Sequence, residues 1–174
     1  MTNENSRVMI RVPKTVGDAI DTCVGRTHLS RPDVILDACR QFRVALVSFE
    51  HSLIESIKDK DVSIEAKDRY YREEVWKFTD PYREFYNKQV KDSKGEVLSI
   101  LLTMPPGEQI QIEGVVSRDP DIRTHQDYYK LALGYFILHF HKIGTYETDV
   151  LDYFLDRMNV DNEVSKLRKE LEGS

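Results

Sequence analysis

The chain has 174 residues, of which 40% are hydrophobic and 32% charged, and its formal net charge is −5. This composition is that of an ordinary globular protein, and no apolar run reaches the roughly 18 residues that a membrane span needs. The N-terminal sequence MTNENSR has no apolar segment of the kind found in secretory signals. We therefore expect a cytoplasmic protein with no membrane partner, in which Cys23 and Cys39 are buried free thiols.

The charge is unevenly distributed along the chain. Residues 1–43 contain seven Lys or Arg against five Asp or Glu, whereas the remainder contains 18 against 25. A mildly basic head on an acidic body suits local contact with a polyanion, but the charge of the whole chain counts against DNA binding.

The first predicted element is a strand over RVMIRVP, residues 7–13, which ends at Pro13. Its residues alternate between two faces. The apolar face consists of Val8, Ile10 and Val12, and the outward face of Arg7, Met9 and Arg11. A lone strand leaves backbone N–H and C=O groups unpaired and is not stable by itself, so we expect a partner strand.

Two helices are predicted next. The first covers about residues 15–25 and ends near Gly25. The second begins at SRPD, where Ser30 can cap the helix and Pro32 occupies the first turn, and it runs to about Lys58. Its apolar residues alternate in steps of four and three, which predicts a coiled-coil seam of Ile35, Cys39, Phe42, Leu46, Phe49 and Leu53.

A charged turn, KDKDVSIEAKD, precedes a third helical segment. This segment carries a second seam, with Tyr71, Val75, Phe78, Tyr82 and Phe85. Asp80-Pro81 resembles a new cap and first turn, so we expect a break or kink there. We interpret Trp76 and the neighbouring tyrosines as core or dimer seam rather than as a ligand-binding cluster.

The sequence KDSKGE (91–96) is the best internal boundary, and three kinds of element are predicted after it. Residues 97–104 read as a strand, and residues 108–116 also alternate like one. An apolar helix capped by Thr124, with Asp127 at its third position, ends near Gly144. Two short helices follow, over YETDVLDYFLDRM and NEVSKLRKELEGS.

A strand ended by proline, a short helix, a turn and a helix opened by SRPD resemble the ribbon-helix-helix family of DNA-binding proteins, of the Arc, MetJ and CopG type. The resemblance covers residues 7–48, and the residues that carry it are VMIRVP, Ile20, Leu29, SRPD, Ile35, Ala38 and Phe42. It implies that the strand pairs antiparallel with the same strand of a second copy, and that the resulting ribbon enters the major groove.

The resemblance also implies site residues. The base-reading positions are Arg7, Met9 and Arg11, of which the arginines can bind guanine O6 and N7. Met9 departs from the usual polar residue and can make only apolar contacts. The phosphate-binding positions are Ser30 and Arg31, together with backbone amides at the start of the second helix, and we interpret Lys14 as a further phosphate contact. Read without the family, these residues form a solvated strand face and an ordinary helix cap.

The chain also contains a candidate internal repeat. When Pro105 is set on Pro13, SILLTMP overlays RVMIRVP. After a two-residue insertion, Thr124, Asp127, Ala132 and Phe136 fall on Ser30, Asp33, Ala38 and Phe42. The chain would then be a pseudo-dimer whose two strands pair within one molecule. The outward face of the second strand would be uncharged, with Ser99, Leu101 and Thr103.

A competing interpretation makes 97–104 and 108–116 a hairpin around PPGE, in a separate effector or oligomerisation module. This interpretation requires a homodimer to build the ribbon, whereas the tandem repeat does not. In either case we expect a mainly α fold with a tail (1–6), a ribbon-helix-helix head (7–60), a helical connector (61–94) and a C-terminal module (95–174).

We interpret the protein as a sequence-specific DNA-binding transcriptional regulator, a repressor acting on double-stranded DNA. No nucleophile–base pair, phosphate-binding glycine loop or metal motif is present, so we expect neither an enzyme nor a cofactor. His139 and His141 are two residues apart and cannot chelate a metal from one helix, even with His125. The alternative is a protein-interaction module, antitoxin-like or an adaptor. A repressor that senses a small molecule is a third hypothesis.

Overall fold

The computed structural model describes residues 5–143. This part of the chain is mainly helical, with one two-stranded antiparallel sheet that begins at its N-terminal end, as the sequence predicts at this coarse level. The elements in chain order are β1 (Ser6–Pro13), α1 (Lys14–Thr27), α2 (Arg31–Ile57), α3 (Ile64–Asp92), β2 (Val97–Met104), α4 (Pro106–Arg118) and α5 (His125–Ile143). The two short helices predicted after Gly144 and most of the N-terminal tail lie outside the described residues.

The partner of the first strand lies in the same chain. β1 pairs antiparallel with β2, from Ser6 opposite Met104 to Pro13 opposite Val97. Each strand is followed by two helices, α1 and α2 after β1, and α4 and α5 after β2, with α3 between the two sets. One chain therefore builds a complete two-stranded ribbon without a second subunit.

The predicted hairpin around PPGE is wrong, because residues 108–116 belong to helix α4. Apolar alternation in QIQIEGVV fits a strand, but among the described residues the sheet consists of β1 and β2 alone. Within α4 the residues buried against the core are Ile112 and Val115, which are three apart and so share one helix face. The tertiary context therefore decides an element that the local pattern leaves ambiguous.

The two predicted helix starts are confirmed. At α2, the Ser30 hydroxyl accepts a hydrogen bond from the Asp33 backbone N–H at 3.2 Å. At α5, the Thr124 hydroxyl accepts one from the Asp127 backbone N–H at 3.1 Å, and the Asp127 carboxylate accepts one from the Thr124 N–H at 3.2 Å. The second arrangement is a reciprocal capping box, in which two otherwise unpaired backbone donors are satisfied.

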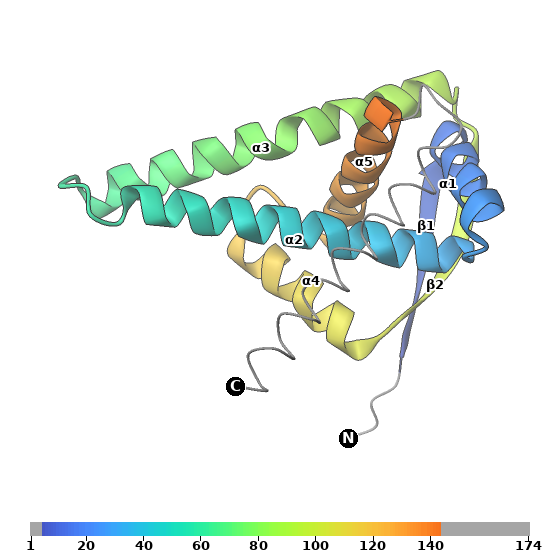
Figure 1. Ribbon diagram of the computed structural model, residues 1–174, viewed down its shortest axis with the longest axis horizontal. Helices are drawn as coiled ribbons and strands as arrows, with labels where there is room; N and C mark the ends of the chain where they lie inside the picture. The colour runs from blue at the N-terminus through green and yellow to red at the C-terminus, as the bar shows by residue number, and fades with distance from the viewer. Residues whose placement is uncertain (1–4, 144–174) are drawn as a thin grey trace, which may run out of the picture.

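Helices α2 and α3 form a long hairpin that opens away from its turn, and α5 packs against both helices (Figure 1). The predicted seam of α2 faces this core: five of its six members are buried, and Phe49 is half-buried. Of the break or kink predicted at Asp80-Pro81, the break is wrong, since α3 continues through Pro81. One missing backbone hydrogen bond is tolerated here because α3 is held against α5 along the same stretch.

The close approach of α3 and α5 depends on a glycine. A Cβ atom at Gly134 of α5 would lie 2.4 Å from the carbonyl oxygen of Tyr82 and 3.1 Å from its carbonyl carbon. Because the obstacle is backbone, no side-chain rotation can relieve it. Only glycine lets the two helices pack at this distance.

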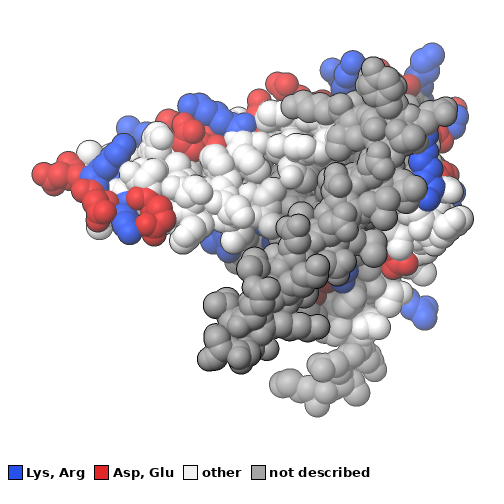
Figure 2. All heavy atoms as spheres, in the orientation of Figure 1, with Lys and Arg blue, Asp and Glu red and all other residues white. Residues whose placement is uncertain are grey.

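The far end of the α2–α3 hairpin carries both signs of charge. Figure 2 shows acidic and basic side chains intermixed around this end and along the upper edge of the molecule, with uncharged surface across the middle of this face. Such a surface gives a polyanion no patch of a single sign. Between residues 5 and 143, none of the helices combines the length and the apolar character that a transmembrane segment requires.

Candidate nucleic-acid interface

The outer face of the ribbon brings together both sets of outward residues that the sequence indicates. These residues are Arg7, Met9 and Arg11 of β1, and Ser99, Leu101 and Thr103 of β2, and all six are exposed. The opposite face is buried in the core through Ile10, Val12, Ile100, Leu102 and Met104. One side of the ribbon therefore stabilises the fold, while the other is open to a partner.

The register gives this outer face a defined arrangement. Met9 lies opposite Leu101, and the two are also counterparts in the overlay of Pro105 on Pro13, so they mark the centre of the ribbon. Arg7 lies opposite Thr103, and Arg11 lies opposite Ser99. The face consequently has a cationic edge along β1, a hydroxyl-bearing edge along β2 and an apolar centre.

Both arginines of this face are available for a ligand. Neither Arg7 nor Arg11 has a hydrogen-bond or ion-pair partner for its guanidinium among residues 5–143. A guanidinium presents several N–H donors in a fixed fork, which suits two adjacent acceptors on one ligand. The face thus offers two such forks on one strand.

Lys14 lies just after the ribbon, in the first turn of α1. Its ammonium is 3.9 Å from the Glu96 carboxylate, and both side chains are mostly exposed. An ion pair of this kind contributes little because water screens it. Lys14 can therefore leave Glu96 for a phosphate, although the nearby carboxylate lowers the local positive potential.

Ser30 and Arg31, the other predicted phosphate contacts, both have partners within the protein. The Ser30 hydroxyl caps α2 and donates to the Asp33 carboxylate at 2.8 Å. Arg31 makes a two-pronged ion pair with Asp21, with Nε–Oδ1 at 2.6 Å and Nη2–Oδ2 at 3.0 Å. These hydrogen bonds raise the pKa of Arg31, which stays charged. The pairing with Asp21, ten residues away in another helix, has no signature in the sequence.

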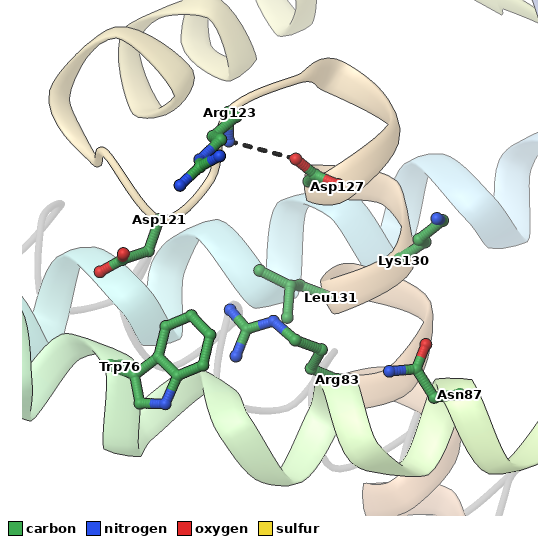
Figure 3. A pocket seen from close by; sticks show the side chains of 8 residues that line it. All are labelled: Trp76, Arg83, Asn87, Asp121, Arg123, Asp127, Lys130 and Leu131. Carbon is green, nitrogen blue, oxygen red and sulfur yellow. Dashed lines mark hydrogen bonds between the residues drawn. The ribbon is translucent and has the colours of Figure 1, made fainter.

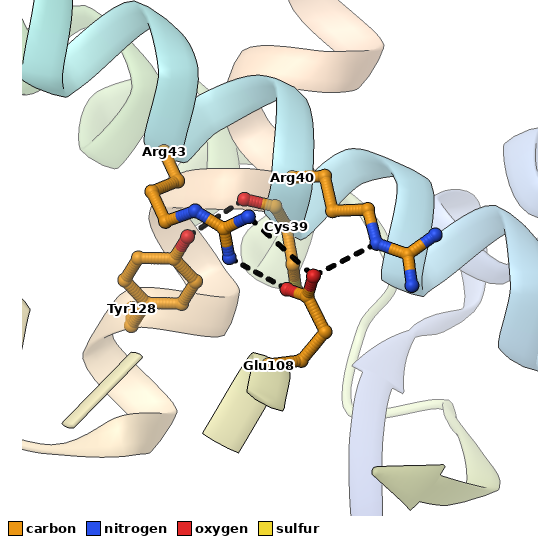
Figure 4. A network of polar contacts seen from close by, with 5 residues as sticks. All are labelled: Cys39, Arg40, Arg43, Glu108 and Tyr128. Carbon is orange, nitrogen blue, oxygen red and sulfur yellow. Dashed lines mark hydrogen bonds and ion pairs between the residues drawn. The ribbon is translucent and has the colours of Figure 1, made fainter. Parts of the chain in front are cut away.

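A polar network behind the ribbon holds α4 against α2 (Figure 4). Arg43 Nη1 lies 2.6 Å and Arg40 Nε 2.9 Å from the two carboxylate oxygens of Glu108. Burial alone would raise the pKa of Glu108, but the hydrogen bonds from Arg43 and Arg40 outweigh it and leave the pKa below its usual value. The ion pairs of Arg40 and Arg43 with Glu108 therefore fix the position of α4, the helix that follows β2.

The same region contains one of the two thiols. Cys23 and Cys39 are free and buried, as the sequence predicts. Burial raises the pKa of Cys39 to about 12, so it remains a protonated, unreactive thiol at neutral pH. Tyr128 donates a hydrogen bond to the Cys39 carbonyl oxygen at 2.7 Å, which ties α5 to α2.

The histidines considered as metal ligands form no such site in the described part of the chain. Among residues 5–143, no group of three or more His, Cys, Asp or Glu side chains is placed to hold a metal ion. His139 packs against the ring of Tyr135, with centroids 4.2 Å apart. The side chain of His141 lies outside the described residues.

Comparisons with protein-family models, with curated proteins and with solved structures find no match for this chain. An interpretation of its function therefore depends on its own residues and geometry.

Proposed function

We propose that this protein is a sequence-specific DNA-binding transcriptional regulator of the ribbon-helix-helix type. In this proposal β1 and β2 of a single chain form the ribbon that enters the major groove. One observation carries the proposal: an antiparallel ribbon with one face buried in the core and two unpaired arginines on the exposed face. The major groove of B-form DNA is wide enough to admit a two-stranded ribbon.

The side chains on the outer face suit the edges of base pairs. Arg7 and Arg11 can each donate to O6 and N7 of a guanine, and Ser99 or Thr103 can contact several bases. Met9 and Leu101 at the centre are 51% and 48% exposed, and apolar side chains of this kind can contact a thymine methyl group. Because both arginines come from β1 and the outward face of β2 carries none, we expect a DNA site whose two halves differ in sequence.

Contacts with the DNA backbone would come from Lys14 and from the first turn of α2. A helix N-terminus offers free backbone N–H groups and the positive end of the helix dipole. Asp21 and Asp33 oppose a phosphate at this position, because they lie against Arg31 and Ser30. With a net charge of −5, we expect weak binding to DNA of arbitrary sequence and a dependence on base contacts for affinity.

The test is to select bound duplexes from a random pool and to titrate the selected duplex by fluorescence anisotropy at two salt concentrations. Arg11→Ala should weaken binding to the selected duplex by about 1–3 kcal/mol and relax the preference at one base position. The matched control is Arg69→Ala, an exposed arginine near the N-terminal end of α3, which should bind as the wild type does. An equal loss on all sequences would make Arg11 a phosphate contact, and no salt-dependent binding would end the proposal.

A protein-interaction module, either antitoxin-like or an adaptor, is the second candidate. Val44, Val47 and Ile54 of α2 are each about half exposed and recur at coiled-coil spacing on one side of the helix, which is a surface suited to a partner helix. If this is the main role, the same titration should detect no DNA binding that responds to salt. Replacing the three residues by serine should then abolish binding of the protein partner, while Arg7→Ala and Arg11→Ala should leave that binding unchanged.

A further inference from the structure

A cavity of about 330 Å³ lies between α3 and the segment that leads into α5 (Figure 3). Its walls include Trp76, Arg83 and Asn87 from α3, and Asp121, Arg123 and Lys130 from the loop and α5. This volume is at the lower end of the range for small-molecule sites. The sequence does not indicate the cavity, because its two sides are about forty residues apart. Of the two places that the sequence indicates for Trp76, the core is wrong, because its side chain is 44% exposed, and the dimer seam stays a prediction.

Arg83 supplies an unsatisfied donor to this region. Its guanidinium carbon lies 3.9 Å from the centre of the Trp76 ring, and Nη2 donates to the Thr79 hydroxyl at 3.2 Å. Nη1 is 3.6 Å from an Asp80 carboxylate oxygen, yet it is buried and has no hydrogen-bond partner within residues 5–143. A buried donor without an acceptor is costly, and an anionic ligand would supply that acceptor once the guanidinium turns toward the cavity.

Two further cations line the cavity and are available. Arg123 and Lys130 are exposed, and neither side chain has an ion-pair partner in the described part of the chain. Of the two carboxylates in the wall, that of Asp127 is occupied by the backbone N–H groups of Arg123 and Thr124, both at 3.2 Å. Three cations and the carboxylates of Asp121 and Asp127 therefore line the cavity, and Asp121 makes no ion pair within residues 5–143.

Trp76 and Asp121 also line a second cavity of about 330 Å³, on the side of Arg72 and Lys77. The indole thus has Arg83 on one side and open space beside it, which provides a flat apolar wall for a ring. Asp121 and the Asn87 amide can accept hydrogen bonds from hydroxyl or amino groups. Together these features are complementary to a ligand with an anionic group, hydrogen-bond donors and a flat ring.

We propose that this cavity binds a small phosphate ester of the nucleoside monophosphate class. The phosphate would lie among Arg83, Arg123 and Lys130, and the ring beside Trp76, with hydroxyl groups directed to Asp121. The proposal does not depend on DNA binding by the ribbon, since none of these residues belongs to β1 or β2. If both proposals hold, the cavity is a site through which a metabolite could influence the regulator.

The chain offers a direct probe, because Trp76 is its single tryptophan. The full chain is titrated with adenosine 5′-monophosphate, and separately with adenosine and with inorganic phosphate, while tryptophan fluorescence is recorded. We expect a saturable change with the monophosphate, and binding at least about tenfold weaker for either part alone, because each part makes only some of the contacts.

Two pairs of variants test the role of the cations. Arg123→Ala and Lys130→Ala alter exposed side chains and should leave folding intact, but each should raise the Kd about three- to tenfold. The matched controls, Arg69→Ala and Lys88→Ala, remove exposed cations of α3 that do not line the cavity, and should leave the Kd unchanged. Circular dichroism verifies that all four variants are folded.

Three results would overturn the proposal. The first is no saturable change with the monophosphate. The second is an unchanged Kd in both Arg123→Ala and Lys130→Ala. The third is a fluorescence change produced by duplex DNA and not by the monophosphate, which would make these cations contacts for the DNA backbone.

Discussion

Replacing Gly134 by alanine tests how closely α3 and α5 pack. The added Cβ would lie 2.4 Å from the Tyr82 carbonyl oxygen, whereas a carbon–oxygen contact is normally about 3.3–3.6 Å. The two helices would have to separate by about 1 Å, which loosens the contacts along their interface. Overpacking of this kind costs about 1–3 kcal/mol, and we expect the upper half of that range because the obstacle is backbone rather than a movable side chain.

Equilibrium unfolding in urea, followed by circular dichroism, measures this cost. Gly114→Ala is the matched control, because Gly114 also lies inside a helix but has no atom within 4 Å of an added Cβ. There the gain in helix propensity should stabilise the protein by up to about 1 kcal/mol. The two variants should therefore shift the free energy of unfolding in opposite directions. A Gly134→Ala variant as stable as the wild type would refute the close packing of α3 and α5.

Three further predictions concern single side chains. Lys14→Ala should weaken binding to every DNA sequence alike, and should reduce the slope of log K against log salt by about one, as measured by anisotropy over a salt series. The buried Glu50 carboxylate accepts hydrogen bonds from Tyr71 and, at 3.1 Å, from two nitrogens of Arg118. Glu50→Gln should therefore destabilise the protein by about 2 kcal/mol in urea unfolding. An unchanged unfolding midpoint would contradict this. Burial raises the pKa of Asp119 to about 6. The Asp119 carboxyl therefore holds its proton more tightly in the folded protein than in the unfolded one. Stability is consequently lost as the pH rises from about 4 to about 6. Asp119→Asn should therefore be more stable than the wild type by up to about 3 kcal/mol near neutral pH, with no such gain near pH 4, in unfolding curves recorded across that range.

Local patterns in the sequence predict much of this fold. Alternation in RVMIRVP identifies β1, and the cap residues Ser30 and Thr124 mark the starts of α2 and α5, because strand faces and helix caps depend on neighbouring residues. The overlay of Pro105 on Pro13 points to the second strand for the same reason. It also indicates the outward residues of both strands, which form the outer face of the ribbon.

The predictions from the sequence fail where contacts between distant parts of the chain determine the local structure. Residues 108–116 alternate like a strand, yet they belong to helix α4, in which the buried Ile112 and Val115 share one helix face. Asp80-Pro81 predicts a break or kink, but the helix does not break there, and α3 contacts α5. The ion pair of Arg31 with Asp21 and the cavity beside Trp76 both join residues from separate elements, and no spacing rule connects them.

The central claim is that Arg11 on the outer face of the ribbon contacts a guanine in the major groove. The most direct test replaces guanines of the selected duplex one at a time by 7-deazaguanine, which lacks the N7 acceptor that an arginine fork needs. We predict that one replacement weakens binding of the wild type by about 1 kcal/mol or more, and that the same replacement has no effect on Arg11→Ala. If no replacement weakens the wild type, or if the loss is the same in the variant, Arg11 does not read that guanine and the account is wrong.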